Sequence, residues 1–159
     1  MNWETELADL LSELSTVQDD LLHVLRAKRE CMAQRDAAGM TSLQASEAEL
    51  GNRLQACHDR RTALLAAARD TGVPCDSLGK LVKQLPVGKR DTLGKQVKES
   101  ALRSRLMQHE SLTNWVIAQR TMLHLSQMIE IIATGGRLKP TYGKCDPALA
   151  RGALVDQEA

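Results

Sequence analysis

The segment from Ser111 to Gly143 restricts the fold of this chain more than any other. Its apolar residues recur at steps of three and four, the period of an amphipathic helix. The residues at these steps are Leu112, Trp115, Ala118, Met122, Leu125, Ile129 and Ile132. Four more apolar residues lie on flanking faces: Val116, Leu123, Met128 and Ile131. A helix packed on one side needs only one apolar stripe. This helix is therefore predicted to pack in its own domain and also to offer surface to another protein, and Gly135 and Gly136 predict its C-terminal cap.

The composition favours helix along the whole chain. Of the 159 residues, 43% are apolar, phenylalanine is absent, and aromatic residues make up 2%. The apolar residues are mainly leucine and alanine, which favour helix, whereas strands are enriched in β-branched and aromatic residues. The chain is therefore predicted to be all-α, and its length is that of one domain.

Charge and targeting signals exclude several classes of protein. The net charge is +1, so no overall field attracts nucleic acid or membrane. The first residues lack the basic and apolar regions of a secretory signal, and no run approaches the roughly 18–20 apolar residues of a membrane span. The four cysteines have no CxxC spacing, which favours reduced, structural thiols. These features predict a cytoplasmic protein without stable membrane insertion.

Two heptad seams predict a long antiparallel helical hairpin. The first helix is predicted over about residues 3–35, where seam residues alternate steps of four and three. These residues are Leu7, Leu11, Leu14, Gln18, Leu21, Leu25, Lys28, Met32 and Arg35. Residues 36–39 are predicted to supply the turn, and the second helix follows over about residues 40–70. A turn this short between long helices makes an antiparallel hairpin.

The remaining helices are less regular in sequence. A short helix is predicted over about residues 76–85, where Asp76 and Ser77 are candidate caps. A third long helix is predicted over about residues 89–134. The domain boundaries that follow are 1–143 for the helical bundle and 144–159 for a disordered tail.

The charge distribution favours one order of the long helices. Residues 1–20 contain six acidic and no basic residues, whereas residues 80–105 contain eight basic and two acidic residues. In an up-down-up three-helix bundle these two blocks meet, although each exposed pair contributes little. At 1.5 Å per residue, the first two helices are roughly 45–50 Å long and the third roughly 65 Å. The end of the third helix, Met122 to Ala133, is therefore predicted to extend past the hairpin.

Several short motifs, in this order and at this spacing, resemble the FlgN-like flagellar export chaperones. They begin with Leu21-Leu22 and Leu25 in the first helix and Arg35-Asp36 at the first turn. They continue with Leu50 to Arg61, Leu64-Leu65, Leu78, Leu81, and Asn114 at the start of the long apolar run. The last is Thr141-Tyr142-Gly143, which matches the terminal tYg of the family.

The resemblance implies a cytosolic chaperone that holds hook-associated proteins unassembled before type III export. It implies that the third helix binds the C-terminal helical segment of the client and that Tyr142 docks at the membrane export gate. Together with the apolar periodicity, this gives six candidate client-binding residues: Trp115, Met122, Leu125, Met128, Ile129 and Ile132. The protein is expected to be a monomer or weak dimer, to need no cofactor and to catalyse no reaction.

Less specific interpretations compete at several of these residues. Packing in the core competes with client binding for Met107, Met122 and Met128, because methionine serves both uses. For Trp115, core packing is the favoured interpretation. The chain could instead be a coiled-coil structural or adaptor protein that self-associates through its heptad seams. A stable oligomer in light scattering would indicate such an adaptor.

The sequence gives little support for catalysis, metal binding or nucleic-acid binding. The four histidines have no ligand spacing, and the phosphate-binding and nucleophile motifs are absent. The basic stretch from Lys80 to Arg105 lacks the aromatic residues that stack on single strands. A solvated, partly paired face is the favoured interpretation of this stretch.

Overall fold

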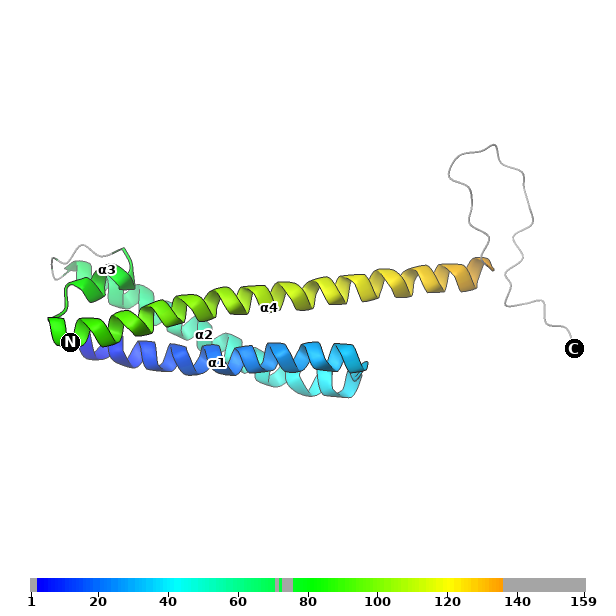
Figure 1. The fold of residues 1–159 in the computed structure, drawn as a ribbon, viewed down its shortest axis with the longest axis horizontal. Helices are drawn as coiled ribbons and strands as arrows, with labels where there is room; N and C mark the ends of the chain where they lie inside the picture. Colours follow the sequence, from blue (N-terminus) through cyan, green and yellow to red (C-terminus); the bar gives the residue numbers. More distant parts are fainter. Residues whose placement is uncertain (1–2, 71, 73–75, 136–159) are drawn as a thin grey trace, which may run out of the picture. The chain divides into compact units, whose positions relative to one another are not determined.

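The computed structural model describes residues 3–70, 72 and 76–135. These residues form four α-helices, and no strand occurs among them (Figure 1). The helices are α1 (Trp3–Gln34), α2 (Ala37–Asp70), α3 (Leu78–Lys83) and α4 (Val87–Thr134). The prediction of an all-α fold is confirmed. The chain divides into two compact units, residues 1–114 and residues 115–159, so the division falls inside α4.

The turn between α1 and α2 differs from its prediction. Arg35 is in the left-handed conformation with φ of 59°, and the Asp36 N–H donates to the Cys31 carbonyl at 2.8 Å. This closes α1 in the manner of a Schellman motif. The Asp36 carboxylate then accepts the Gly39 N–H at 2.8 Å and caps α2. The predicted turn over 36–39 is wrong because this cap starts α2 at Ala37, which places Gly39 inside the helix.

Gly39 leaves room for the side chains that pack against the start of α2, and its own backbone is helical. A Cβ atom there would lie 2.9 Å from the Cys31 Sγ and would also collide with the Asp36 carboxylate. Such distances are shorter than van der Waals contact, so any larger residue would displace the cap. The first turn of α2 therefore depends on a glycine that the sequence pattern alone assigns to a loop.

Helices α1 and α2 lie side by side in opposite directions (Figure 1). Lys28 pairs with Glu47 at 2.7 Å, and Glu13 pairs with Arg60 at 2.5 Å. The pair that lies later in α1 lies earlier in α2, as expected for two antiparallel helices. Between the helices, a small core is formed by Val17, Leu21, Val24 and Leu50.

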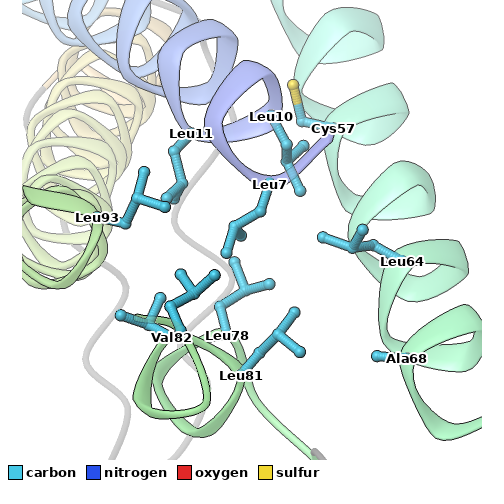
Figure 2. Close-up of a cluster of buried hydrophobic side chains, with 11 residues drawn as sticks. Leu7, Leu10, Leu11, Cys57, Leu64, Ala68, Leu78, Leu81, Val82 and Leu93 are labelled. Atoms are coloured by element: carbon cyan, nitrogen blue, oxygen red, sulfur yellow. The ribbon is translucent and has the colours of Figure 1, made fainter. Parts of the chain in front are cut away.

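The largest core cluster lies where all four helices converge (Figure 2). Helix α3 begins at an N-cap, Ser77, whose hydroxyl accepts the Lys80 N–H at 3.3 Å. This cap aims three leucine and valine side chains of a six-residue helix into the core. The cluster contains Leu7, Leu10 and Leu11 of α1, Cys57, Leu64 and Ala68 of α2, Leu78, Leu81 and Val82 of α3, Leu85, and Leu93 of α4.

Helix α4 is attached to α1 mainly through polar side chains within the first unit. Gln18, only 1% exposed, donates to the Ser100 carbonyl at 3.1 Å and to the Ser104 hydroxyl at 2.9 Å. Asn114 is also buried and donates to the Leu25 carbonyl at 2.8 Å. Buried hydrogen bonds of this kind fix the register of two helices, because a shifted register would leave their groups unpaired.

Ion pairs add to this attachment. Glu4 pairs with Lys89 at 2.9 Å and Asp19 with Arg103 at 2.8 Å, so the predicted meeting of the acidic and basic blocks is confirmed for these two pairs. The buried Glu110 carboxylate accepts from Arg29 at 2.6 Å and lies 3.7 Å from the Arg26 guanidinium. These contacts with α4 thus occur along α1 from its first turn, at Glu4, to its last third, at Arg29.

Truncation of the main core cluster should destabilise the protein strongly. Leu81 is fully buried, so Leu81→Ala should lower the free energy of unfolding by about 2–5 kcal/mol through lost burial and a residual cavity. Leu102→Ala is the matched control, because Leu102 is 67% exposed, and its cost should stay within about 0.5 kcal/mol. Urea unfolding monitored by circular dichroism measures both. Equal effects of the two variants would contradict the position of the core.

Reversal of the acidic partners should weaken the α1–α4 attachment in a salt-dependent way. Glu4→Lys with Asp19→Lys replaces two attractions by repulsions, and exposed pairs of this kind contribute about 1 kcal/mol or less each. The melting temperature should fall by roughly 2–4 °C at low ionic strength and by less in high salt. The control is Asp20→Lys with Glu49→Lys, two exposed acids with no ion pair among the described residues. A control that melts as low as the test variant would contradict the paired geometry.

Candidate functional site

The described part of the second unit, residues 115–135, presents apolar side chains on an exposed helix. The six residues predicted to bind a client have exposed fractions between 45% and 66%. They are Trp115, Met122, Leu125, Met128, Ile129 and Ile132. Such a group of exposed apolar side chains marks either an interaction site or an aggregation liability.

These residues lie on one side of the helix. At about 100° per residue, they fall with Ile117 and Ala118 within an arc of roughly 160°. We call these eight residues the apolar stripe: Trp115, Ile117, Ala118, Met122, Leu125, Met128, Ile129 and Ile132. From Trp115 to Ile132 the stripe is roughly 26 Å long, at 1.5 Å per residue. An amphipathic helix of a partner of about five turns matches this length.

One polar residue, Thr121, lies within the arc of the stripe. Its hydroxyl donates to the Ile117 carbonyl at 2.9 Å, one turn earlier in α4. At the edge of the stripe, the Ser126 hydroxyl donates in the same way to the Met122 carbonyl at 2.9 Å. Hydroxyls satisfied inside the helix lose no hydrogen bond to water when an apolar partner covers them. The stripe can therefore be desolvated at low cost along its whole length.

The charges of this helix lie away from the stripe. Between Trp115 and Thr134 the formally charged residues are Arg120 and Glu130, and both lie on the opposite side at about 100° per residue. The positions that flank the stripe are held by uncharged residues such as Gln119 and Ser126. Attraction to a partner therefore comes from apolar burial, which is non-directional. Flexible methionine side chains at two positions let the surface adapt to different partners.

Core packing of Trp115, the favoured sequence interpretation, is wrong. Its side chain is 60% exposed, because the three- and four-residue steps define which residues share a face and not what covers that face. Met122 and Met128 are exposed as well, whereas Met107 is half-buried against the small core of α1 and α2. The spacing of apolar residues along the sequence could not by itself distinguish the exposed methionines from the half-buried one.

Apolar side chains also occur outside the stripe. Val116, Leu123 and Ile131 are all exposed on the other side of the same helix. The helix is thus apolar on several faces, as its sequence predicts. The stripe is distinguished by the absence of charge, since Arg120 and Glu130 both lie on the opposite side.

The end of α4 is fixed by a glycine. Helix α4 ends at Thr134, and Gly135 has φ of 62°, the left-handed conformation that closes many helices. The predicted C-cap is therefore confirmed at Gly135. The predicted docking residue Tyr142, the second glycine of the cap and the predicted tail lie outside the described residues.

A pocket in the first unit was missed by the sequence interpretation. It lies among α1, α2, α3 and α4 and includes Leu11, Gln18, Cys57 and Leu78 in its lining. Burial raises the pKa of the Cys57 thiol, and the nearby Glu13 carboxylate adds to the effect. The available signal was Gln18, a polar residue in an otherwise apolar part of the first heptad seam. No spacing rule connects it to side chains far away in the sequence.

In residues 3–70, 72 and 76–135, no group of three or more His, Cys, Asp or Glu side chains could hold a metal ion. None of the four helices seen in this part of the chain combines the length and apolar character needed to cross a bilayer. The exposed apolar helix and the pocket are the features that bear on function.

Comparison with known protein families identifies the chain. The family described as FlgN protein matches residues 1–145, which is most of the sequence. The chain belongs to the FlgN family. Neither the curated proteins nor the solved structures gave a match. FlgN proteins are flagellar export chaperones, and a chaperone for flagellar proteins is the general function of this chain.

The family match covers the first unit of this FlgN chain and the second unit as far as residue 145. It includes the four helices α1 to α4 and continues beyond them to residue 145. Every residue of the apolar stripe therefore lies within the matched region. A chaperone needs exposed apolar surface to hold an unassembled protein, and the stripe provides such a surface.

The stripe should be dispensable for folding of this FlgN protein. Leu125→Asp with Ile129→Asp changes two exposed side chains, so the cost is limited to helix propensity, about 0.7 kcal/mol or less per residue. Circular dichroism and thermal melting should show an unchanged helix content and a melting temperature within a few degrees of the wild type. Leu81→Asp, in the core, is the contrasting variant and should unfold. Unfolding of the double Asp variant would show that these residues stabilise the fold.

Proposed function

We propose that this FlgN protein binds the C-terminal helical region of hook-associated proteins through its apolar stripe. In the cytoplasm it keeps these clients unassembled and delivers them to the flagellar export gate. The observation that carries the proposal is the apolar stripe from Trp115 to Ile132, which bears no charge and is mostly exposed. Family membership supports a flagellar client, and the helical form of the stripe supports a helical one.

The proposed mechanism is competition with assembly. A client that assembles through an amphipathic C-terminal helix has an apolar face that is exposed until it reaches its partner subunits. A stripe of matched length covers that face and blocks association. Because no ion pair is needed, release at the gate requires only that the client helix be drawn away from an adaptable surface. This mode fits a chaperone that hands its client on.

We further propose an up-down-up bundle as the support for this helix. The ion pairs that join α1 to α2 and α1 to α4 agree with this order of helices. Tyr142, at the match to the terminal tYg motif, is proposed to contact the export gate. The protein is proposed to act as a monomer or weak dimer, because a stable dimer through the stripe would occupy the client site.

A self-associating adaptor is the competing function, and one observation favours it. The stripe residues Trp115, Ala118, Met122, Leu125, Ile129 and Ile132 follow heptad steps, which also suit a coiled coil with a second copy. Light scattering of the purified protein distinguishes the two. A stable oligomer that the client peptide fails to dissociate would favour the adaptor.

Client binding should depend on the stripe and not on the other faces of the helix. In titration calorimetry with a hook-associated protein's C-terminal peptide, Leu125→Asp with Ile129→Asp should weaken binding roughly a hundredfold or more, since buried anchors contribute about 2 kcal/mol or more each. The matched control is Val116→Asp with Leu123→Asp, which makes the same change on the other side of the helix. The control should bind within a few-fold of the wild type. Equal loss in both variants would contradict the stripe.

Delivery should be separable from binding. Tyr142→Ala should leave the affinity for the client peptide nearly unchanged but lower the amount of client exported in a secretion assay. Tyr142→Phe, which keeps the ring, tests whether the hydroxyl is needed. Normal export with Tyr142→Ala would remove Tyr142 from the proposal while leaving client binding intact.

A further inference from the structure

Helix α4 contains a glycine that its packing does not require. Gly94 lies inside α4 directly after Leu93, which belongs to the main core cluster (Figure 2). A Cβ atom at Gly94 would meet the Val82 Cγ1 atom at 3.7 Å, an ordinary van der Waals contact. Alanine would therefore fit, and it would favour the helix, because glycine is among the weakest helix formers. Glycine at this position instead makes it easier for the helix to bend or unwind.

The part of α4 that follows this glycine is held to α1 with little apolar burial. We call residues 95–114 the α4 arm. The buried residues of the arm are Ser100, Glu110 and Asn114, which are all polar, and its large apolar residues are half-buried or exposed. Apolar burial is the main favourable contribution to folding, so the arm gains little of it. Elements with few buried apolar contacts open at a lower free energy than the core.

The attached form of the arm also contains buried acceptors without partners. Three buried side-chain oxygens have no hydrogen-bond partner in the described part of the chain: Gln18 Oε1, Gln96 Oε1 and Asn114 Oδ1. Gln18 belongs to α1, and the other two residues belong to the arm. Each oxygen has lost its hydrogen bond to water and gained none in return, which raises the free energy of the attached form. Because Gln18 and Asn114 bond across α1 and α4, separation of these helices returns both oxygens to water.

We propose that the α4 arm is a hinged element, which releases from α1 as one piece by bending at Gly94 while the main core cluster stays folded. On one side of the hinge, Leu93 remains in the core. On the other side, the polar contacts from Ser100 onward separate. Release uncovers the small core of α1 and α2 against which Met107 packs, so the first unit exposes more apolar surface without unfolding. This device goes beyond the proposed function and does not depend on it.

The test is hydrogen exchange of the backbone amides in the full-length protein, followed residue by residue with NMR. A released helix of this length is only marginally stable in water, so its amides exchange. The amides of the arm should exchange at least tenfold faster than those of the core residues Leu10, Leu11 and Leu64. Gly94→Ala should slow exchange of the arm roughly fivefold, the difference in helix propensity between the two residues. The factor should be the same throughout residues 95–114, because one opening exposes them all.

Matched variants separate the hinge from general effects. Gly51→Ala makes the same change in α2, where a Cβ atom meets open space, and should leave exchange of the arm within twofold of the wild type. Gln18→Leu removes one sealed oxygen and leaves the Ser100 carbonyl with its bond inside the helix, so exchange of the arm should slow at least threefold. Its control is Gln55→Leu, at an exposed position of α2. Gln18→Met replaces Gln18→Leu if leucine lowers the melting temperature.

Four results would overturn the proposal. Arm amides that exchange as slowly as the core would show that the arm has no opening of its own. Equal slowing by Gly94→Ala and Gly51→Ala would show that the whole first unit opens together. An effect of Gly94→Ala confined to residues 95–99 would indicate local fraying of the helix. Faster exchange in Gln18→Leu would show that this amide holds the arm more than it strains the attached form.

Discussion

The polar attachment of α4 to α1 is the interaction on which the rest of the structure depends. Within α4 the buried residues are Leu93, Ser100, Glu110 and Asn114, so one apolar and three polar side chains anchor it. Apolar burial would tolerate a shifted register, whereas buried hydrogen bonds and a carboxylate between two arginines do not. The register of the third long helix is thus set by Gln18, Glu110 and Asn114 more than by leucine packing.

Because polar contacts hold α4 in place, this helix can be both apolar and exposed. The apolar core is supplied mainly by α1, α2 and α3, which gather their leucines where the four helices converge. Helix α4 contributes Leu93 to that cluster, with Val97 packed beside it, and its remaining large apolar residues are half-buried or exposed. The apolar residues from Trp115 to Ile132 are therefore largely exposed, and the proposed client site is built on that exposure.

The sequence predicts the helices better than it predicts their surroundings. Leucine heptads locate the long helices, and Gly135 locates the end of the last one, because these signals act within a few residues. The predicted turn over 36–39 is misplaced because the Asp36 cap starts α2 before the glycine that marks a turn in sequence. Periodicity favours a core position for Trp115 because it groups residues by face without showing what covers the face. The pocket could not be predicted, since its lining comes from distant segments.

The apolar stripe supplies binding strength more than selectivity. It offers apolar area without charge, so it attracts many amphipathic helices and distinguishes poorly among them. Buried hydrogen bonds are what make a contact directional. In this chain they lie between α1 and α4, at Gln18 and Asn114, where they fix the register of the fold. A mutation in the stripe should therefore lower the affinity for all clients together.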